Sequence, residues 1–176
     1  MKYHKINTLL FLVACVVTGY LVHNHYKILN ATGSFHSFCS MSKTVDCDLV
    51  NASRYSEYLG VPVATLGFAY SLFALILNFF AYRNPFFRRE ALVVLISVGF
   101  LSVLASVANF FLSVSVLKTV CVFCLTHQFI CVATFILTLL AARDFGKLYP
   151  YNKKKVLQIF GGGAALVFFS VLVSSQ

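Results

Sequence analysis

Residues 91–142 decide the fold of this chain: ALVVLISVGFLSVLASVANFFLSVSVLKTVCVFCLTHQFICVATFILTLLAA. Lys118 is the only Lys, Arg, Asp or Glu in this stretch. A helix that crosses a bilayer needs about 20 predominantly apolar residues, so the stretch can cross twice. We predict spans at 91–117 and 120–142, joined by Lys118 and Thr119. So short a connection requires an antiparallel hairpin.

Three other apolar runs complete the pattern, at residues 6–26, 63–82 and 156–173, of which the last is near the lower limit of length. None shows the alternation of barrel strands, so helices are expected. Hydrophobic residues make up 60% of the chain and charged residues only 11%, whereas soluble proteins carry about 25% charged residues. The sequence predicts an all-α membrane protein, a four-helix transmembrane bundle plus a fifth transmembrane helix.

Positive charge sets the expected orientation. The net charge of +9 would suggest nucleic acid in a soluble protein, but here the charges lie between apolar runs, so no nucleic-acid partner is expected. If the N-terminus is cytoplasmic, ten of the 14 Lys and Arg residues lie inside and four outside. Because inside segments are enriched in Lys and Arg, we expect the N-terminus in the cytoplasm and the C-terminus outside.

The longest segment between spans, residues 27–60, lies outside in this topology and holds Cys39 and Cys47. Ser53 begins a short amphipathic stretch, residues 53–59, where its hydroxyl can cap a helix. We therefore expect an outer loop that carries a short helix.

Cys121-Val-Phe-Cys124 stands at the outer start of the fourth span, with Thr119 as the expected N-cap. Cysteines three residues apart share one helical face. The positive end of the helix dipole favours thiolate, and Lys118 adds a nearby positive charge. The spacing predicts a reactive cysteine pair, although two small buried thiols would look alike.

The second pair, Cys39 and Cys47, shares a compartment with Cys121 and Cys124 in this topology. Alone, it could be a structural staple of the loop. Two pairs on one membrane face suggest a relay, in which a thiolate attacks a disulfide and forms a mixed disulfide.

Four elements occur together in a known pattern: Cys39-x7-Cys47, then Ser53, then Gly60-Val-Pro-Val-Ala-Thr-Leu-Gly67, then Cys121-x-x-Cys124. Together they resemble the vitamin K epoxide reductase family, on its bacterial side, from the first span through the fourth. The resemblance implies a four-helix bundle around a quinone site, with ubiquinone or menaquinone as the quinone. It also implies a bacterial inner membrane, or an endoplasmic reticulum membrane if the chain is eukaryotic.

Some bacterial members carry a fused thioredoxin domain after the fifth span. Because this chain ends at Gln176, just after the predicted fifth span, the resemblance implies a separate periplasmic thioredoxin-fold partner.

The resemblance also implies a role for each cysteine. Cys39 accepts electrons from the partner through a mixed disulfide, Cys47 attacks Cys121, and Cys124 is the thiolate that faces the quinone. Ser53 matches the family hydroxyl that helps to position the site. The implied function is a membrane thiol–disulfide oxidoreductase that supports disulfide-bond formation.

One position departs from the animal members, which have a Tyr one turn after the second cysteine of the CxxC motif. This chain has Gln128 there, beside His127. The difference favours plain quinone reduction; the alternative is a vitamin K epoxide or quinone reductase of the endoplasmic reticulum. Gln128 or His127 could bind a quinone carbonyl or simply form an interhelical hydrogen bond.

A rival interpretation uses the same residues as metal ligands, because Cys121, Cys124 and His127 have C-x2-C-x2-H spacing and His36 precedes Cys39. A transmembrane helix would hold such ligands rigidly, and the fourth would have to come from the loop. We therefore predict no metal site. A non-catalytic scaffold would leave both cysteine pairs unexplained.

Overall fold

The structure is a computed structural model that describes residues 2–30, 37, 39–40, 42, 44–58, 60–145, 154, 156–159 and 161. Within these residues lie four long helices: α1 (Lys2–Asn30), α3 (Val63–Arg83), α4 (Arg88–Leu112) and α5 (Val122–Phe145). Each is long and apolar enough to cross a membrane. The prediction of an all-α membrane bundle is confirmed.

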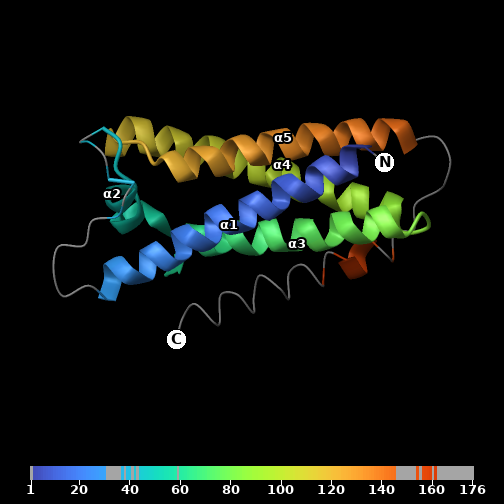
Figure 1. Cartoon of the computed structure of the whole chain (residues 1–176), viewed down its shortest axis with the longest axis horizontal. Coiled ribbons are helices and arrows are strands. Elements are labelled where there is room, and N and C mark those ends of the chain that lie inside the picture. Colours follow the sequence, from blue (N-terminus) through green and yellow to red (C-terminus); the bar gives the residue numbers. More distant parts are fainter. Residues whose placement is uncertain are drawn as a thin grey trace.

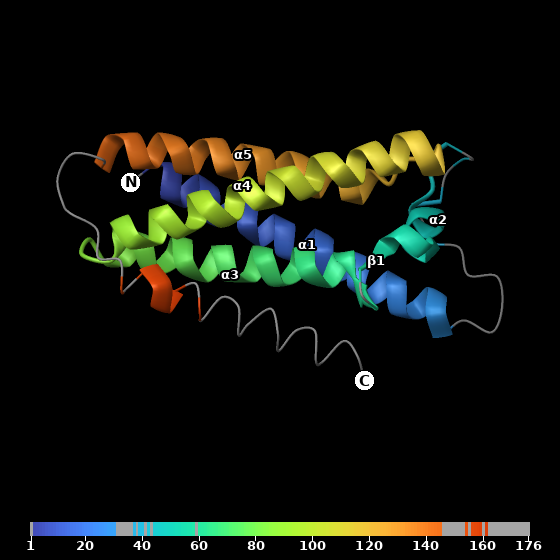
Figure 2. The same cartoon turned by 180° about the vertical axis from the view of Figure 1, so that it is seen from behind.

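The four long helices pack as an antiparallel bundle (Figures 1 and 2). Helix α1 packs against α3 and α5, and α4 packs against the same two helices. The short helix α2 (Cys47–Ala52) lies at the end of the bundle where α1 and α4 finish and α3 and α5 begin (Figure 1). We call this the cap end. The α3–α4 connection lies at the opposite end (Figure 2).

The α4–α5 connection forms the expected hairpin tip at the cap end. Helix α4 continues through a π-helical turn, η2 (Ser113–Leu117), and Lys118 follows with a left-handed φ of 53°. This left-handed conformation ends the helix, because a right-handed helix requires a negative φ at every residue. The Ser113 hydroxyl donates to the carbonyl of Thr119 (2.6 Å), which holds the turn closed.

The outer loop contains a short helix, but not where the sequence predicted it. Helix α2 begins at Cys47, because the Asp46 carboxylate accepts hydrogen bonds from the N–H groups of Asp48 (2.9 Å) and Leu49 (3.0 Å). Ser53, the expected cap, instead donates its hydroxyl to the carbonyl of Val50 (2.8 Å) and closes the end of α2. The predicted helix at 53–59 is therefore wrong in position.

The rest of the segment 53–59 takes other structures. A 3-10 turn, η1 (Arg54–Ser56), leads into strand β1 (Glu57–Tyr58), which pairs antiparallel with β2 (Val61–Pro62). Gly60 turns between these strands at φ 78°, a conformation that glycine adopts without a Cβ penalty. This hairpin brings the chain directly to the first turn of α3.

The bundle core at the end opposite the cap contains both apolar and polar side chains. Its buried apolar residues come from α1, α3 and α4: Phe11, Ala74, Leu77, Ala81, Ala91, Val94 and Leu95. Asn78 joins α3 to α1 by accepting a hydrogen bond from His4 Nδ1 (3.0 Å) and donating to Thr8 Oγ1 (2.9 Å). Inside a bilayer the hydrophobic effect does not drive helices together, so such interhelical hydrogen bonds help to hold them in contact.

The predicted fifth span, residues 156–173, lies mostly outside the described residues. Within them, Lys154, residues 156–159 and Gly161 are helical. Val156 and Ile159 pack against the core cluster of α1, α3 and α4. The membrane crossing of this segment stays a prediction.

Candidate functional site

Four of the six cysteines form two disulfides. Cys39 is bonded to Cys47 with a Cα–Cα distance of 5.5 Å, and Cys121 to Cys124 with 5.2 Å. Both Cα separations lie in the usual range for this bond. Cys15 and Cys131 are free thiols.

Backbone contacts hold the two pairs together at the cap end. The N–H of Asp46, one residue before Cys47, donates to the carbonyl of Val120, one residue before Cys121 (3.2 Å). The Val120 N–H in turn donates to the carbonyl of Thr44 (2.9 Å). Sequence reasoning could place the pairs only in one compartment, whereas the structure makes their chain segments direct neighbours.

Three of the four disulfide-bonded cysteines belong to one buried cluster. Cys47 is 0% exposed, Cys121 2% and Cys39 4%, and these three lie together with Leu21 of α1. Cys124 packs against the cluster but is itself only half-buried. The fourth sulfur therefore occupies a different environment from the other three.

Cys121, rather than Thr119, is the N-cap of α5. Its carbonyl accepts the first helical hydrogen bond, from Leu125 N–H (3.0 Å), and its Sγ accepts the Cys124 N–H (3.1 Å). Thr119 lies three residues before the start of α5, and its hydroxyl makes no hydrogen bond within the described residues, so the expected cap position is wrong. Both sulfurs still lie at the helix N-terminus, where the dipole favours negative charge.

A cavity of about 780 Å³ opens beside Cys124, between the cap-end halves of the four long helices. Residues 50–51 and 53–58 of the outer loop line the cavity on one side, which we call the roof. Apolar side chains form much of the wall, including Leu21, Val63, Leu66, Val98, Leu101 and Leu112. Polar and charged groups are interspersed among them, including Ser53, Arg54, Glu57, Tyr70, His127 and Gln128. This size and lining match a ligand pocket for a largely apolar molecule with a few polar atoms, and a quinone ring fits that description.

All four residues that the sequence suggested for quinone contact, Ser53, Cys124, His127 and Gln128, line this one cavity. Their placement on a common wall is an observation, whereas their contact with a quinone stays a prediction. Gln128 is half-buried there. The Ser53 hydroxyl already donates its hydrogen to the carbonyl of Val50.

His127 makes the interhelical hydrogen bond that was the alternative to a quinone contact. The Ser71 hydroxyl donates to the carbonyl of Gly67 (2.8 Å), so it accepts from His127 Nε2–H (3.3 Å). The backbone of Gly67 lies close to the ring, since a Cβ there would be in van der Waals contact with His127 Cε1 (3.4 Å) and Thr18 Cγ2 (3.4 Å). Gln128 is therefore the better candidate for a ligand contact.

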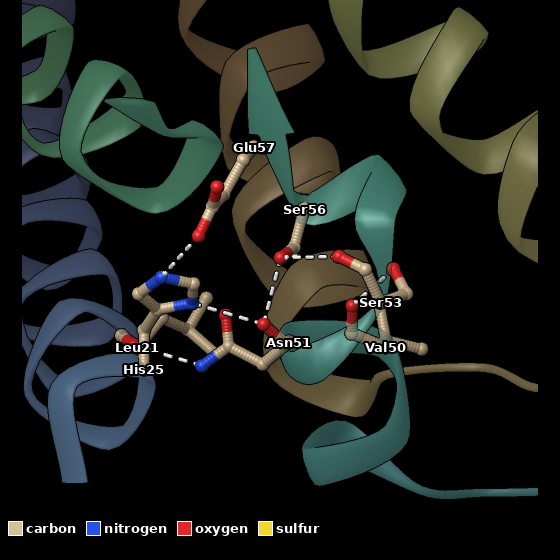
Figure 3. Close-up of polar contacts among 7 residues, drawn as sticks. All are labelled: Leu21, His25, Val50, Asn51, Ser53, Ser56 and Glu57. Carbon is tan, nitrogen blue, oxygen red and sulfur yellow. Dashed lines mark hydrogen bonds and ion pairs between the residues drawn. The ribbon is translucent and has the colours of Figure 1, made fainter. Parts of the chain in front are cut away.

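Sequence reasoning missed the polar network that fastens α2 and the roof to α1. The Asp48 carboxylate accepts from Asn24 Nδ2 (2.9 Å) and from the Ser37 N–H (2.6 Å). Figure 3 shows a second set of contacts, in which Asn51 Nδ2 donates to the Leu21 carbonyl (3.0 Å). Asn24 sits in an apolar run, which is a signal for an interior contact, but nothing in the sequence identified its loop partner.

A metal cluster is not formed by the described residues, among which no group of three or more His, Cys, Asp and Glu side chains converges. His127 points to Ser71, and Cys121 and Cys124 are bonded to each other. His36, the other candidate ligand, lies outside the described residues.

The Asp46 cap supports the site because α2 carries Cys47. We expect Asp46→Ala to reduce the stability of the protein by about 1 kcal/mol, the usual cost of losing an N-cap. Thermal unfolding in detergent, followed by circular dichroism, measures the change. Asp46→Asn is the matched control, since Asn also caps helices well. Equal stability of Asp46→Ala and wild type would contradict the assignment.

A protein-family model described as the vitamin K epoxide reductase family matches residues 5–139. The matched range runs from α1 into α5 and includes both cysteine pairs, the roof and the cavity. No curated protein gives a significant match to the chain.

Proposed function

The chain belongs to the vitamin K epoxide reductase family, and from this premise we propose that it oxidises the dithiol of a thioredoxin-fold protein and passes the electrons to a quinone. The family match and the four apolar helices together indicate a multi-pass membrane oxidoreductase. In the proposal it lies in the inner membrane with its N-terminus in the cytoplasm. The partner and both cysteine pairs then share the periplasmic side, where the reaction supports disulfide-bond formation.

The observation that carries the proposal is that, of the four cysteines in the two disulfides, Cys124 alone lines the cavity. Cys39, Cys47 and Cys121 are buried together, whereas Cys124 lines the cavity. A relay needs sulfurs close enough to exchange bonds and one sulfur in reach of the electron acceptor. This arrangement supports both requirements.

The proposed chemistry begins at the loop pair. A thiolate of the partner attacks Cys39 Sγ, which breaks the Cys39–Cys47 bond and releases Cys47 as a thiolate. The second partner thiol then attacks the mixed disulfide, so that the partner leaves oxidised and Cys39 and Cys47 are reduced. Each step exchanges one S–S bond for another.

The electrons then move to the inner pair. Cys47 attacks Cys121 Sγ, and Cys124 leaves as a thiolate into the cavity. Cys39 next attacks Cys47, which restores the loop disulfide and leaves Cys121 and Cys124 reduced. The position of Cys124 in the first turn of α5 favours this leaving group, because the helix dipole stabilises its negative charge.

A bound quinone supplies the two-electron acceptor that returns Cys121 and Cys124 to the disulfide. The dithiol loses two electrons and two protons, and the quinol gains both, so no other reactant is needed. In the proposal the Gln128 amide donates a hydrogen bond to a quinone oxygen beside Cys124. The apolar wall excludes water from the thiolate, which limits its loss to side reactions.

Absorbance of a soluble quinone tests the proposal directly. Purified protein in detergent, supplied with dithiothreitol and a short-chain ubiquinone or menaquinone, is expected to convert quinone to quinol at a rate proportional to protein concentration. Cys15→Ala is a suitable control, because it removes a free thiol of α1 and should not change the rate. Protein with intact cysteines that reduces neither quinone would overturn the proposal.

A further inference from the structure

One buried histidine at the cap end faces a carboxylate across the roof. His25 of α1 is 2% exposed, and its Nε2 lies 3.4 Å from Glu57 Oε1 on β1 (Figure 3). Its other nitrogen, Nδ1, lies 2.9 Å from the carbonyl oxygen of Asn51. The imidazole therefore stands between two oxygen atoms from different parts of the roof.

Hydrogen-bond chemistry decides where the protons of this pair must be. A backbone carbonyl only accepts, so His25 Nδ1 carries a hydrogen. Without a further proton, Nε2 would turn its lone pair toward the Glu57 carboxylate, and two acceptors would face each other. The arrangement is favourable when one more proton lies between Nε2 and Oε1. The distance of 3.4 Å is an ion-pair distance, longer than an ordinary N–H···O hydrogen bond.

Of the two residues, Glu57 lies on the boundary between the cavity and the outside. Glu57 lines the same cavity as Cys124, while its side chain is 40% exposed. The His25 ring packs edge-on against Tyr26, with ring centroids 5.8 Å apart. The other titratable side chains on the described cavity wall are Arg54 and Tyr55 on η1, Tyr58 on β1, Tyr70 on α3, and Cys124 and His127 on α5.

Other described carboxylates have different tasks or positions. Asp46 caps α2, and Asp48 is bound to Asn24 and Ser37. Glu90 belongs to the first turn of α4, at the opposite end of the bundle. Of these four carboxylates, Glu57 is the one that reaches the cavity.

We propose that the His25–Glu57 pair is a proton-exchange site for the redox reaction in the cavity. The inference rests on the proposed function. When the dithiol of Cys121 and Cys124 is oxidised, two S–H bonds break and two O–H bonds form on the quinol. One of these protons passes through the pair, which donates its shared proton to the quinol oxygen and takes up the proton lost by the Cys124 thiol. Protons and electrons balance without a further reactant.

The same contact also ties the roof to α1, so a test must separate proton exchange from mere attachment. Glu57→Gln does so, because the amide can donate an N–H to His25 Nε2 and keep the attachment, yet it cannot exchange a proton. Glu57→Asp keeps a titratable group on a shorter side chain. His23→Gln is the matched control for His25→Gln, since His23 is exposed two residues earlier on α1.

The first measurement is the pH profile of quinone reduction driven by dithiothreitol. Thiolate formation raises the wild-type rate with pH, and loss of the shared proton lowers it again, so the profile has a maximum. We expect Glu57→Gln and His25→Gln to lose the high-pH fall and to turn over about tenfold to a hundredfold more slowly near neutral pH, within the range for general acid–base catalysis. Glu57→Asp should keep the maximum, and His23→Gln should match the wild type.

The second measurement needs no quinone. NMR of protein with isotopically labelled His and Glu follows both groups through a pH titration. Because they share a proton, the His25 and Glu57 signals should change over one common pH interval, and Glu57→Gln should shift the interval of His25 but not that of His23.

Two results would overturn the inference while leaving the proposed function intact. In the first, Glu57→Gln has the pH profile of the wild type. In the second, Glu57→Gln and Glu57→Asp both reduce quinone more slowly by the same factor at every pH. Unchanged titration of His25 in Glu57→Gln would also overturn it. Failure of the wild-type protein to reduce quinone would instead count against the proposed function, and the NMR titration would still decide whether the pair shares a proton.

Discussion

Cys124→Ala is expected to abolish quinone reduction, whichever dithiol supplies the electrons. Cys124 lines the cavity, whereas Cys39, Cys47 and Cys121 are buried in a neighbouring cluster. No other described member of the two pairs reaches the cavity wall. The rate should fall to the background of quinone and dithiol alone, by roughly three orders of magnitude or more, as when an essential nucleophile is removed.

The measurement is the quinone absorbance assay with dithiothreitol, at equal amounts of folded protein. Cys15→Ala again serves as the control, because it removes a thiol that belongs to neither disulfide. Retention of more than a few per cent of the wild-type rate by Cys124→Ala would show that another group reacts with the quinone.

A double variant tests the geometry of the relay. When Cys39→Ala is combined with Cys124→Ala, one cysteine of each pair remains, Cys47 and Cys121. Because these two residues share one buried cluster, we expect them to form a disulfide with each other. Mass spectrometry of the alkylated, unreduced protein detects that bond. Two free thiols at these positions would argue against transfer between Cys47 and Cys121.

Cys39→Ala is expected to separate two activities that the wild-type protein combines. Oxidation of a thioredoxin-fold partner should stop, because no sulfur remains to form the first mixed disulfide. Reduction of quinone by a small dithiol should persist, since such a reagent can act on the Cys121–Cys124 pair through the cavity. The ratio of the two rates is expected to change by at least about a hundredfold, the scale of losing a nucleophile from one step only.

A reduced thioredoxin-fold protein and dithiothreitol, each paired with the same quinone, give the two rates. Cys47→Ala is the informative comparison, because it also lacks the Cys39–Cys47 disulfide that the partner thiolate attacks and should lose partner oxidation while keeping the reaction of the small dithiol with Cys121 and Cys124. If Cys39→Ala oxidised the partner at the wild-type rate, the order of the relay would be wrong. The low exposure of Cys39, 4%, means that the partner must displace neighbouring chain to reach it.

Local caps were the least predictable part of the site. Thr119 and Ser53 have the right chemistry for helix N-caps, yet Cys121 and Asp46 hold those positions. Both misplacements have one cause. An N-cap needs a side chain that can accept a hydrogen bond and also a backbone conformation that directs it to the first N–H groups of the helix. Contacts with distant segments, such as the bond from Val120 N–H to the Thr44 carbonyl, set that backbone.

The roof network shows a different limit. His25 and Asn24 stand out as polar residues in an apolar run, so an interior contact could be expected of each. Their partners, Glu57 and Asp48, lie more than twenty residues away in a loop whose conformation no sequence pattern predicts. Only the folded loop pairs them.

By itself, the sequence determined the membrane bundle, the antiparallel hairpin around Lys118 and the family, because apolar length and cysteine spacing are properties of contiguous chain. Tertiary structure alone decided that Cys124 faces the cavity while the other three sulfurs are buried, and that His25 meets Glu57. These facts depend on how segments remote in the chain pack against each other. Packing of that kind follows from the whole set of contacts rather than from any local pattern.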